Sequence, residues 1–454
     1  MWTKMFRKDC SDYMHLPSIP EEPGASSLSA GMSGLPTRSQ HGQIEYLNGL
    51  RGLACLSVYI WHFCWPYQTG LFFAYGLDEQ NTSFLQLPFV RLIYAGDAMV
   101  RVFFVLSGLV LSLGPLSAAY DGDIERVAKR VASLGIRRGF RLFIPPVVAS
   151  ICTLIASCLG WLDNLPPSTP APTRAQQHAR IPLRQPNVGL QILDWLHWVV
   201  QSLMNPWPST TIPPASQYGS QFWTIPHEFR CSMTVFVLLV VLSPVRRRVR
   251  LYTTLGLSAY CMVLRREQEE LSLFLAGMGL AQMKISREEG KPPKGNLWAK
   301  LEEIFTWFAL VMGLYLLSWP PNKGYLSPPF RLLGTIDRQH NHWHNLGATI
   351  LLSTVLKIRL AQRFLSLRPI LYLGKISYAL YCVHYLIVLA AGSRLLAFFW
   401  AWTGKESWLQ EQGGFLLGFG LTTCAVIMAS DVFYRTVDSA AIGLARKVED
   451  LVTK

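Results

Sequence analysis

The sequence predicts an all-α fold, a polytopic bundle of about ten transmembrane helices. Half of the 454 residues are hydrophobic, only 15% are charged, and the mean hydropathy is +0.24. This composition differs from that of ordinary soluble proteins. Apolar runs close to the roughly 20 residues that a helix needs to cross a bilayer recur along the chain. The candidate spans are 46–66, 98–117, 140–160, 222–243, 251–264, 271–283, 302–319, 346–360, 371–393 and 413–433.

Three segments are expected to lie outside the spans. Residues 1–44 are rich in Ser, Pro and Gly without a continuous apolar stretch, which indicates a disordered cytosolic tail rather than a cleaved signal peptide. The transmembrane domain covers 45–435, and 436–454 form a second cytosolic tail. Segment 161–221 is a large non-cytosolic loop. Within it, 191–204 is too short to span easily and predicts an interfacial helix, with the tryptophans at headgroup level: Trp195, Trp198 and Trp207.

The distribution of basic residues predicts the orientation. Loops on one side carry 19 Lys or Arg in 60 residues, and loops on the other carry 11 in 142. The positive-inside rule makes the first set cytosolic, together with both termini. The sequon at Asn81 then falls on the non-cytosolic side, as glycosylation requires. The expected location is the endoplasmic reticulum or another endomembrane.

Several functions lack support. The net charge of +14 comes from short basic blocks between apolar runs, and no zinc-finger, homeodomain or RNA-recognition pattern accompanies it, so nucleic acid is not an expected partner. The nine cysteines contain no CxxC pair, which disfavours a disulfide framework or structural zinc. Gly277-x-Gly279 indicates helix packing rather than a phosphate cradle. No Walker or Rossmann loop is present.

Arg51 and His62 are the strongest candidates for chemistry. They lie eleven residues apart in an apolar run, so they project from the same helix face about 16 Å apart. Ionisable groups at such depth normally face a protein interior or a wet cavity. A desolvated, neutral imidazole can act as a general base. The alternative is a histidine that only hydrogen-bonds a neighbouring helix.

Arg138 and Arg141 form an Arg-x-x-Arg pair at the predicted cytosolic end of the third span. Two guanidinium groups at i and i+3 suit phosphate or pyrophosphate groups arriving from the cytosol. The alternative is a basic anchor that meets anionic lipid headgroups.

Three further residues are candidates for the site, and each also has a simpler structural interpretation. Ser107, in FFVLSG, contacts either reacting groups or its own helix backbone. Glu228, in WTIPHE, either orients a hydroxyl or imidazole or is an acid at a helix start. His384 is a second intramembrane titratable group whose simpler role is packing.

The HNHWH segment at 340–344 alternates three histidines. On an extended strand they would share one side and could bind a metal. Because no carboxylate or cysteine is adjacent, the segment is interpreted as a loop at the substrate mouth, and no metal is expected.

In this order the motifs resemble the acyltransferase-3 family of multi-pass membrane acyltransferases, over roughly 44–435. The resemblance comprises the LNGLRGLA opening with Arg51 and His62, FFVLSG, the Arg-x-x-Arg pair, the Trp-x4-Glu motif ending at Glu228, FLAGM at 274–278 and ISYALYCVH at 376–384. Departures include Asn48, where the family usually has an acid, and Arg101 before the FFVLSG motif. The resemblance implies an O-acyltransferase, similar to fungal members that modify secondary metabolites.

The resemblance also implies a site. An acyl-CoA, expected to be acetyl-CoA, is a co-substrate rather than a bound cofactor, and the acceptor is a hydroxyl of a small metabolite or carbohydrate. His62 is the base, Arg138 and Arg141 hold the phosphates with Arg51 assisting, and Ser107 and Glu228 give polar support. The alternatives are a transporter that uses intramembrane Arg and His, or a non-catalytic membrane scaffold. The oligomeric state is not predicted.

Overall fold

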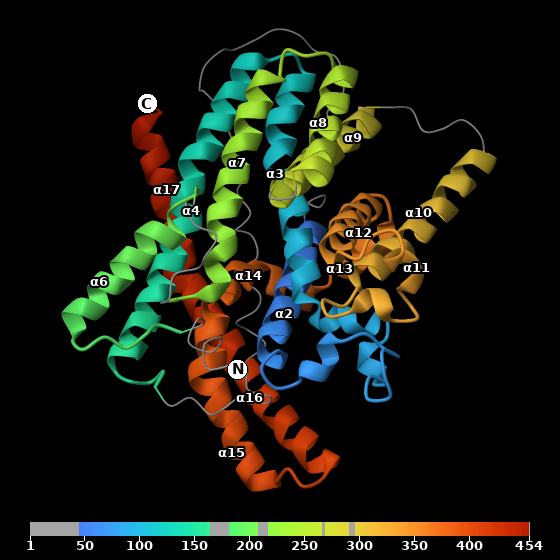
Figure 1. Cartoon of the computed structure of the whole chain (residues 1–454). Coiled ribbons are helices and arrows are strands. Elements are labelled where there is room, and N and C mark those ends of the chain that lie inside the picture. The colour runs from blue at the N-terminus through green and yellow to red at the C-terminus, as the bar shows by residue number, and fades with distance from the viewer. Residues whose placement is uncertain (1–44, 164–180, 208–216, 266–267, 290–295, 454) are drawn as a thin grey trace.

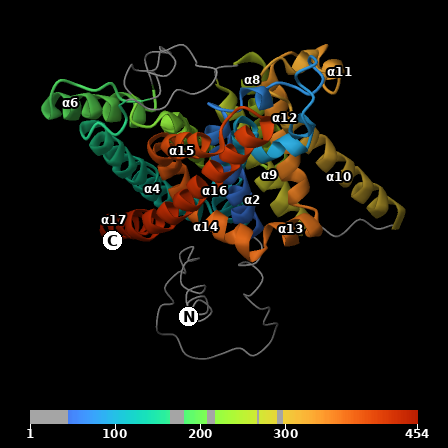
Figure 2. The same ribbon diagram turned by 90° about the horizontal axis from the view of Figure 1, so that it is seen from below.

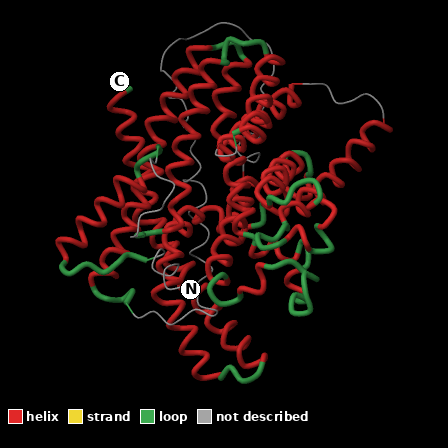
Figure 3. Tube along the Cα trace, viewed as in Figure 1, coloured by secondary structure: helices red, strands yellow, loops and turns green. Residues whose placement is uncertain are grey.

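The computed structural model describes residues 45–163, 181–207, 217–265, 268–289 and 296–453 (Figure 1). The predicted tail 1–44 lies outside these residues. The described residues are helical except for loops and one isolated bridge between Phe73 and Asn322 (Figure 3). The all-α prediction is confirmed.

Each of the ten predicted spans coincides with a helix, but the count of ten crossings is not confirmed. The helices are α2 (Glu45–Cys64), α3 (Gly96–Tyr120), α4 (Ile124–Cys158), α7 (Thr224–Val241), α8 (Arg247–Leu264), α9 (Glu269–Glu289), α10 (Asn296–Leu317), α12 (His340–Val355), α14 (Arg368–Ile387) and α16 (Trp408–Phe433). Among the described residues, five helical stretches are long and apolar enough to cross a membrane: Gly96–Tyr120, Ile124–Cys158, Ser220–Val241, Arg368–Thr403 and Trp408–Val452. The other helices are shorter or carry more charge.

Three helices run further than the sequence predicts. Helix α4 begins at Ile124, so the expected loop 118–141 is largely helical. Helix α14 continues through a π-helical turn into α15 (Ser393–Thr403). Helix α16 continues likewise into α17 (Ser439–Val452), where a terminal tail was expected. Glu449 of α17 forms an ion pair with Arg137 of α4 at 3.2 Å, so α17 is docked on the bundle.

Helix α3 lies at the centre of the bundle and crosses α9 at backbone distance. A Cβ on Gly108 would lie 2.1 Å from the Phe274 carbonyl oxygen, and one on Gly277 would lie 2.1 Å from that of Val105. No side chain fits at such separations, so these glycines permit the crossing. The helix-packing interpretation of Gly277 is confirmed.

Helices α2 and α14 also cross at glycines. A Cβ on Gly52 would lie 2.4 Å from the Gly374 nitrogen, and one on Gly374 would lie 2.2 Å from the Asn48 carbonyl oxygen. This crossing fixes the start of α2 against α14. It therefore sets the face that carries Arg51 and His62 beside the ISYALYCVH segment.

The predicted helix at 191–204 is present as α6 (Val188–Trp198), which continues to Leu203. Figures 1 and 2 show α6 extending from the edge of the bundle. The expectation for its tryptophans is partly wrong: Trp198 is buried against Tyr218 and Phe222, because the helix turns that face inward. Trp207 is exposed, as an interfacial anchor would be.

The loop 67–96 is packed rather than open. The hydroxyl of Tyr94 donates to the carbonyls of Leu85 and Leu71 at 2.7 and 3.1 Å. The neighbouring Arg91 is buried, and this burial lowers its pKa to about 10. The loop thus closes one end of the bundle beside the end of α2.

Candidate active site

Glu228 is the centre of the first polar cluster. Its Oε1 accepts hydrogen bonds from the Ser107 hydroxyl at 3.0 Å and from Nη2 of Arg138 at 2.6 Å. Nε of Arg138 donates to the Ser232 hydroxyl, one turn beyond Glu228, at 3.1 Å. Helices α3, α4 and α7 therefore meet at one carboxylate. Of the two readings of Glu228, the structure favours the orienting one.

Two more arginines lie within electrostatic reach of the Arg138–Glu228 pair. Arg51 interacts with Glu228, Arg138 and Arg141, and its Nη1 donates to the Asn48 side chain at 3.3 Å. Arg141 interacts with Arg138 and with the carboxylate of Asp438. The three arginines therefore face two carboxylates, Glu228 and Asp438, so the cluster keeps positive charge that an anionic group can neutralise.

The helix that carries the Arg-x-x-Arg pair is longer than predicted. Helix α4 begins at Ile124, fourteen residues before Arg138, which places Arg138 about 21 Å along the helix. The pair therefore lies inside a helix that starts well before the predicted span. Little in the sequence marks this start, because charged residues interrupt the apolar ones over 124–137.

His62 lies in a second cluster, made of rings. The His62 ring centroid is 5.2 Å from that of His384 and 5.3 Å from that of Tyr385. His384 is fully buried, and its Nδ1 lies 2.9 Å from the Leu380 carbonyl of its own helix. Nδ1 must therefore carry the hydrogen. Nε2 then carries a lone pair, and this nitrogen has no hydrogen-bond partner among the described residues.

Tyr381 lies between the two clusters. Its hydroxyl donates to the Gln221 carbonyl at 2.5 Å and lies 2.8 Å from the Thr224 hydroxyl. Its ring is 6.4 Å from that of His384, and it interacts electrostatically with Glu228. We call the whole arrangement the polar seam, made of Arg51, Arg138, Arg141, Glu228, Ser107, Tyr381, His384 and His62.

Sequence reasoning did not assign roles to Tyr381, Tyr385 or Ser232. The signal for the tyrosines was present, because Tyr378, Tyr381 and Tyr385 follow at i, i+3 and i+7 and so share a helix face. No comparable signal marks Ser232.

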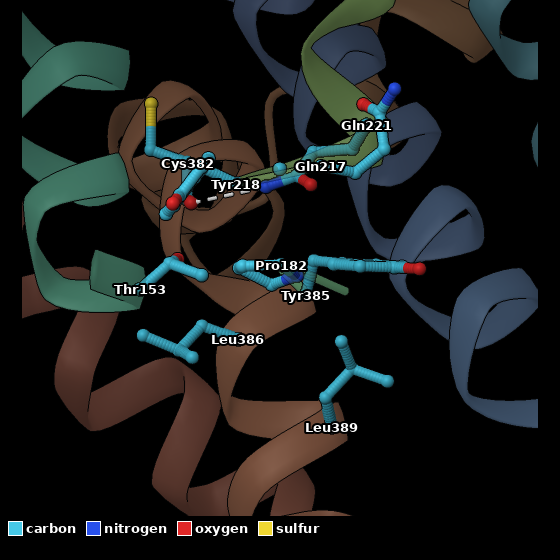
Figure 4. A pocket seen from close by; sticks show the side chains of 10 residues that line it. Thr153, Pro182, Gln217, Tyr218, Gln221, Cys382, Tyr385, Leu386 and Leu389 are labelled. Carbon is cyan, nitrogen blue, oxygen red and sulfur yellow. Dashed lines mark hydrogen bonds between the residues drawn. The ribbon is translucent and has the colours of Figure 1, made fainter. Parts of the chain in front are cut away.

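A small pocket adjoins Tyr385. It is lined by Gln217, Tyr218, Gln221, Cys382, Tyr385, Leu386 and Leu389, among others. Figure 4 shows the Tyr385 side chain extending from this pocket toward the blue helix α2, with Leu386 and Leu389 on the opposite side from Gln221. Tyr385 therefore borders both this pocket and the His62 ring, whose centroid lies 5.3 Å from its own.

Two other predicted features lie away from the seam. Asn81 is buried, and its amide donates to Asp78 at 2.6 Å, so a glycan on that nitrogen would have to be attached at a buried atom. The HNHWH segment is helical, not extended, and begins α12 at His340. His340 and His344 therefore share a helix face, and His342 projects elsewhere.

The two ends of the polar seam carry different functional groups. Guanidinium groups at one end suit an anionic ligand, and paired imidazoles at the other suit proton transfer from a hydroxyl. Arg51 and His62 on α2 belong to opposite ends, about 16 Å apart by helical rise.

Comparison with known proteins agrees with this chemistry. A family model described as an acyltransferase domain, that of the acyltransferase-3 family, matches residues 44–435. An O-acetyltransferase from Phomopsis amygdali, PaAT-1, is 26% identical over 90% of this chain and 87% of its own length. The acyltransferase clz18 of Cochliobolus lunatus is 23% identical over 79% of this chain and 82% of its own. An acyltransferase from a Phoma species is 24% identical over 80% of this chain and 82% of its own. No solved structure gives a significant match. The chain therefore belongs to the acyltransferase-3 family.

Proposed function

We propose that this acyltransferase moves an acetyl group from acetyl-CoA to a hydroxyl of a small metabolite or carbohydrate, with His62 as general base. The observation that carries the proposal is the polar seam, which joins a cationic cluster to a pair of imidazoles inside an apolar bundle. A relative named as an O-acetyltransferase supports the choice of acyl group and of an oxygen acceptor.

The donor occupies the cationic end. Arg51 and Arg141 bind the phosphates of the coenzyme A portion, because Arg138 already pairs with Glu228. Arg138 has a different role in this proposal: it holds Glu228 against the Ser107 hydroxyl. The acyl-CoA is a substrate that leaves after each turnover, not a resident cofactor.

The reaction occurs at the imidazole end. The neutral His62 ring removes the proton of the acceptor hydroxyl, and the hydroxyl oxygen attacks the thioester carbonyl carbon. The carbon–sulfur bond breaks, the sulfur leaves with the bonding electrons, and the His62 proton returns to it. The lone pair on His384 Nε2 orients the His62 ring or the acceptor hydroxyl.

The membrane topology belongs to the same proposal. With both termini in the cytosol, cytosolic acyl-CoA enters at the arginine cluster and the acceptor enters from the non-cytosolic side. The basic loops support this orientation, and the endoplasmic reticulum is the proposed location. Secondary metabolism is the proposed context, and this expectation rests on the resemblance alone.

The experiment is an assay of the purified protein in detergent with acetyl-CoA and an extract of candidate acceptors. The expected result is release of the free coenzyme A thiol together with an acetylated product. This product should be about 42 mass units heavier than its hydroxyl precursor, because one acetyl group replaces one hydrogen. Acceptor-dependent transfer that uses no acyl-CoA would overturn the donor assignment. Solute uptake by reconstituted vesicles, without any acyl product, would favour a transporter instead.

A further inference from the structure

A cluster of metal-ligating side chains lies outside the polar seam, where α3 and α12 begin. Oδ2 of Asp97 lies 3.1 Å from Nε2 of His340 and 3.5 Å from Nδ1 of His344. The three candidate ligand atoms lie within 4.8 Å of one another. Asp97 comes from the first turn of α3, and the two histidines from the first two turns of α12.

The hydrogen bond of His344 to a backbone carbonyl determines which of its ring nitrogens carries the lone pair. Its Nε2 lies 2.9 Å from the Trp319 carbonyl oxygen. A carbonyl can only accept, so Nε2 carries the hydrogen. In the neutral ring Nδ1 is then an acceptor, and it faces another acceptor, the Asp97 carboxylate. His344 is 1% exposed, and Nδ1 has no hydrogen-bond partner in the described part of the chain.

The buried His344 Nδ1 and the partly exposed Asp97 carboxylate are two acceptors that face each other, and a cation between them would satisfy both. A proton on His344 Nδ1 could also link the two groups, but the buried ring would then be a charged imidazolium. A metal ion satisfies both acceptors at once, and a histidine that ligates a metal through one nitrogen commonly donates its other N–H to a backbone carbonyl. His344 has this arrangement, with Trp319 as the carbonyl partner.

Two of the three separations between the ligand atoms fit a tetrahedral site. Zinc–nitrogen and zinc–oxygen bonds of about 2.0–2.1 Å in a tetrahedron place neighbouring ligand atoms about 3.3 Å apart. The two separations from Asp97 Oδ2, 3.1 and 3.5 Å, bracket this value. The other carboxylate oxygen, Oδ1, lies 3.9 Å from Nη2 of Arg101. Arg101 therefore faces the side of Asp97 that the histidines do not use.

We propose that Asp97, His340 and His344 form a binding site for a divalent transition-metal ion, with zinc as the occupant, that pins the start of α12 to the start of α3. Two imidazoles and one carboxylate are a ligand set typical of zinc, and water completes the tetrahedron. The Asp97 position lies ten residues before Ser107, or about 15 Å along α3. The site is accordingly structural and takes no part in acyl transfer.

The test uses the full chain purified in detergent. After removal of loosely bound metal, elemental analysis should find about one zinc per chain. His344→Ala and the nearly isosteric Asp97→Asn should lower the zinc content more than roughly ten-fold. His342→Ala is the matched control, because this histidine lies in the same segment but its Nδ1 is hydrogen-bonded to Asp337. It should retain the zinc.

A second readout separates metal loss from misfolding. The thermal unfolding midpoint of the wild type should fall in a chelator and return when zinc is restored, because a ligand that binds the folded state stabilises it. His340→Ala, at a partly exposed position, should unfold at the same temperature with and without zinc. Wild-type protein that holds no zinc and has a midpoint indifferent to chelator and zinc would overturn the proposal. A His344→Ala variant that binds zinc like the wild type would do so as well.

Discussion

At the scale of single residues, the site depends on which of its three arginines is bound to a carboxylate. Glu228 binds Arg138 at 2.6 Å and accepts from Ser107. Arg51 interacts electrostatically with Glu228, and Arg141 interacts with Arg138 and Asp438, but neither donates a hydrogen bond to Glu228 among those described. Substitution of Arg141 and substitution of Glu228 should therefore have different effects.

Replacing Arg141 by Ala should weaken binding of acyl-CoA. The loss of one charge-assisted contact to phosphate costs about 1.5–3 kcal/mol, which raises KM roughly ten- to hundredfold. Initial rates over a range of acetyl-CoA concentrations measure this. An unchanged KM would assign Arg141 to lipid anchoring instead.

Replacing Glu228 by Gln should destabilise the protein. The change removes the only carboxylate hydrogen-bonded to Arg138 among the described contacts and leaves three arginines facing one another, at a cost of about 1–3 kcal/mol. The measurement is the thermal unfolding midpoint in detergent. Glu125→Gln is the control, because its partner Lys129 is an exposed residue one turn along the same helix and the midpoint should not move. Equal midpoints for both variants would contradict this role of Glu228.

At the scale of helices, glycines determine where the functional residues meet. Gly52 and Gly374 bring α2 against α14, and Gly108 and Gly277 bring α3 against α9. Because the backbones touch, a small shift at either crossing would move catalytic side chains that lie on the same helices.

Replacing Gly277 by Ala should lower stability despite the higher helix propensity of alanine. Its Cβ would lie 2.1 Å from the Val105 carbonyl oxygen, and such overpacking typically costs about 1–3 kcal/mol. Gly256→Ala is the matched control, since nothing lies within 4 Å of its Cβ position and propensity favours alanine by about 1 kcal/mol. The unfolding midpoint should fall for the first variant and rise or stay for the second. A rise for both would refute the close crossing.

The elements were more predictable than the contacts between them. Each of the ten apolar runs coincides with a helix among the described residues, because a long apolar stretch is typical of a buried or membrane-embedded helix. Their ends were missed where polar residues continue a helix, as in α4 before Arg138 and in α17. The motifs identified Arg51, His62, Ser107 and Glu228 as candidates, but the Arg138–Glu228 pair and the Asp97–His344 approach join residues far apart in sequence. A single sequence carries no signal for such contacts.

At the scale of the whole molecule, the account requires one orientation in the membrane. A tag after Lys454 should be digested by protease added to intact microsomes, because the proposed orientation, based on the positive loops, has both termini in the cytosol. A tag in the loop between α15 and α16 should survive until detergent is added. The reverse pattern would place the arginine cluster on the wrong side for cytosolic acyl-CoA.

The central claim is that the His62 imidazole removes the acceptor proton at the end of the polar seam. Its most direct test is the turnover of acetyl-CoA by purified His62→Ala beside His197→Ala, a change at an exposed histidine of α6. General-base catalysis contributes roughly 10²–10⁴-fold, so kcat should fall by that factor in His62→Ala alone, while its unfolding midpoint and KM for acetyl-CoA stay close to those of the wild type. Wild-type turnover by a folded His62→Ala protein would contradict the claim.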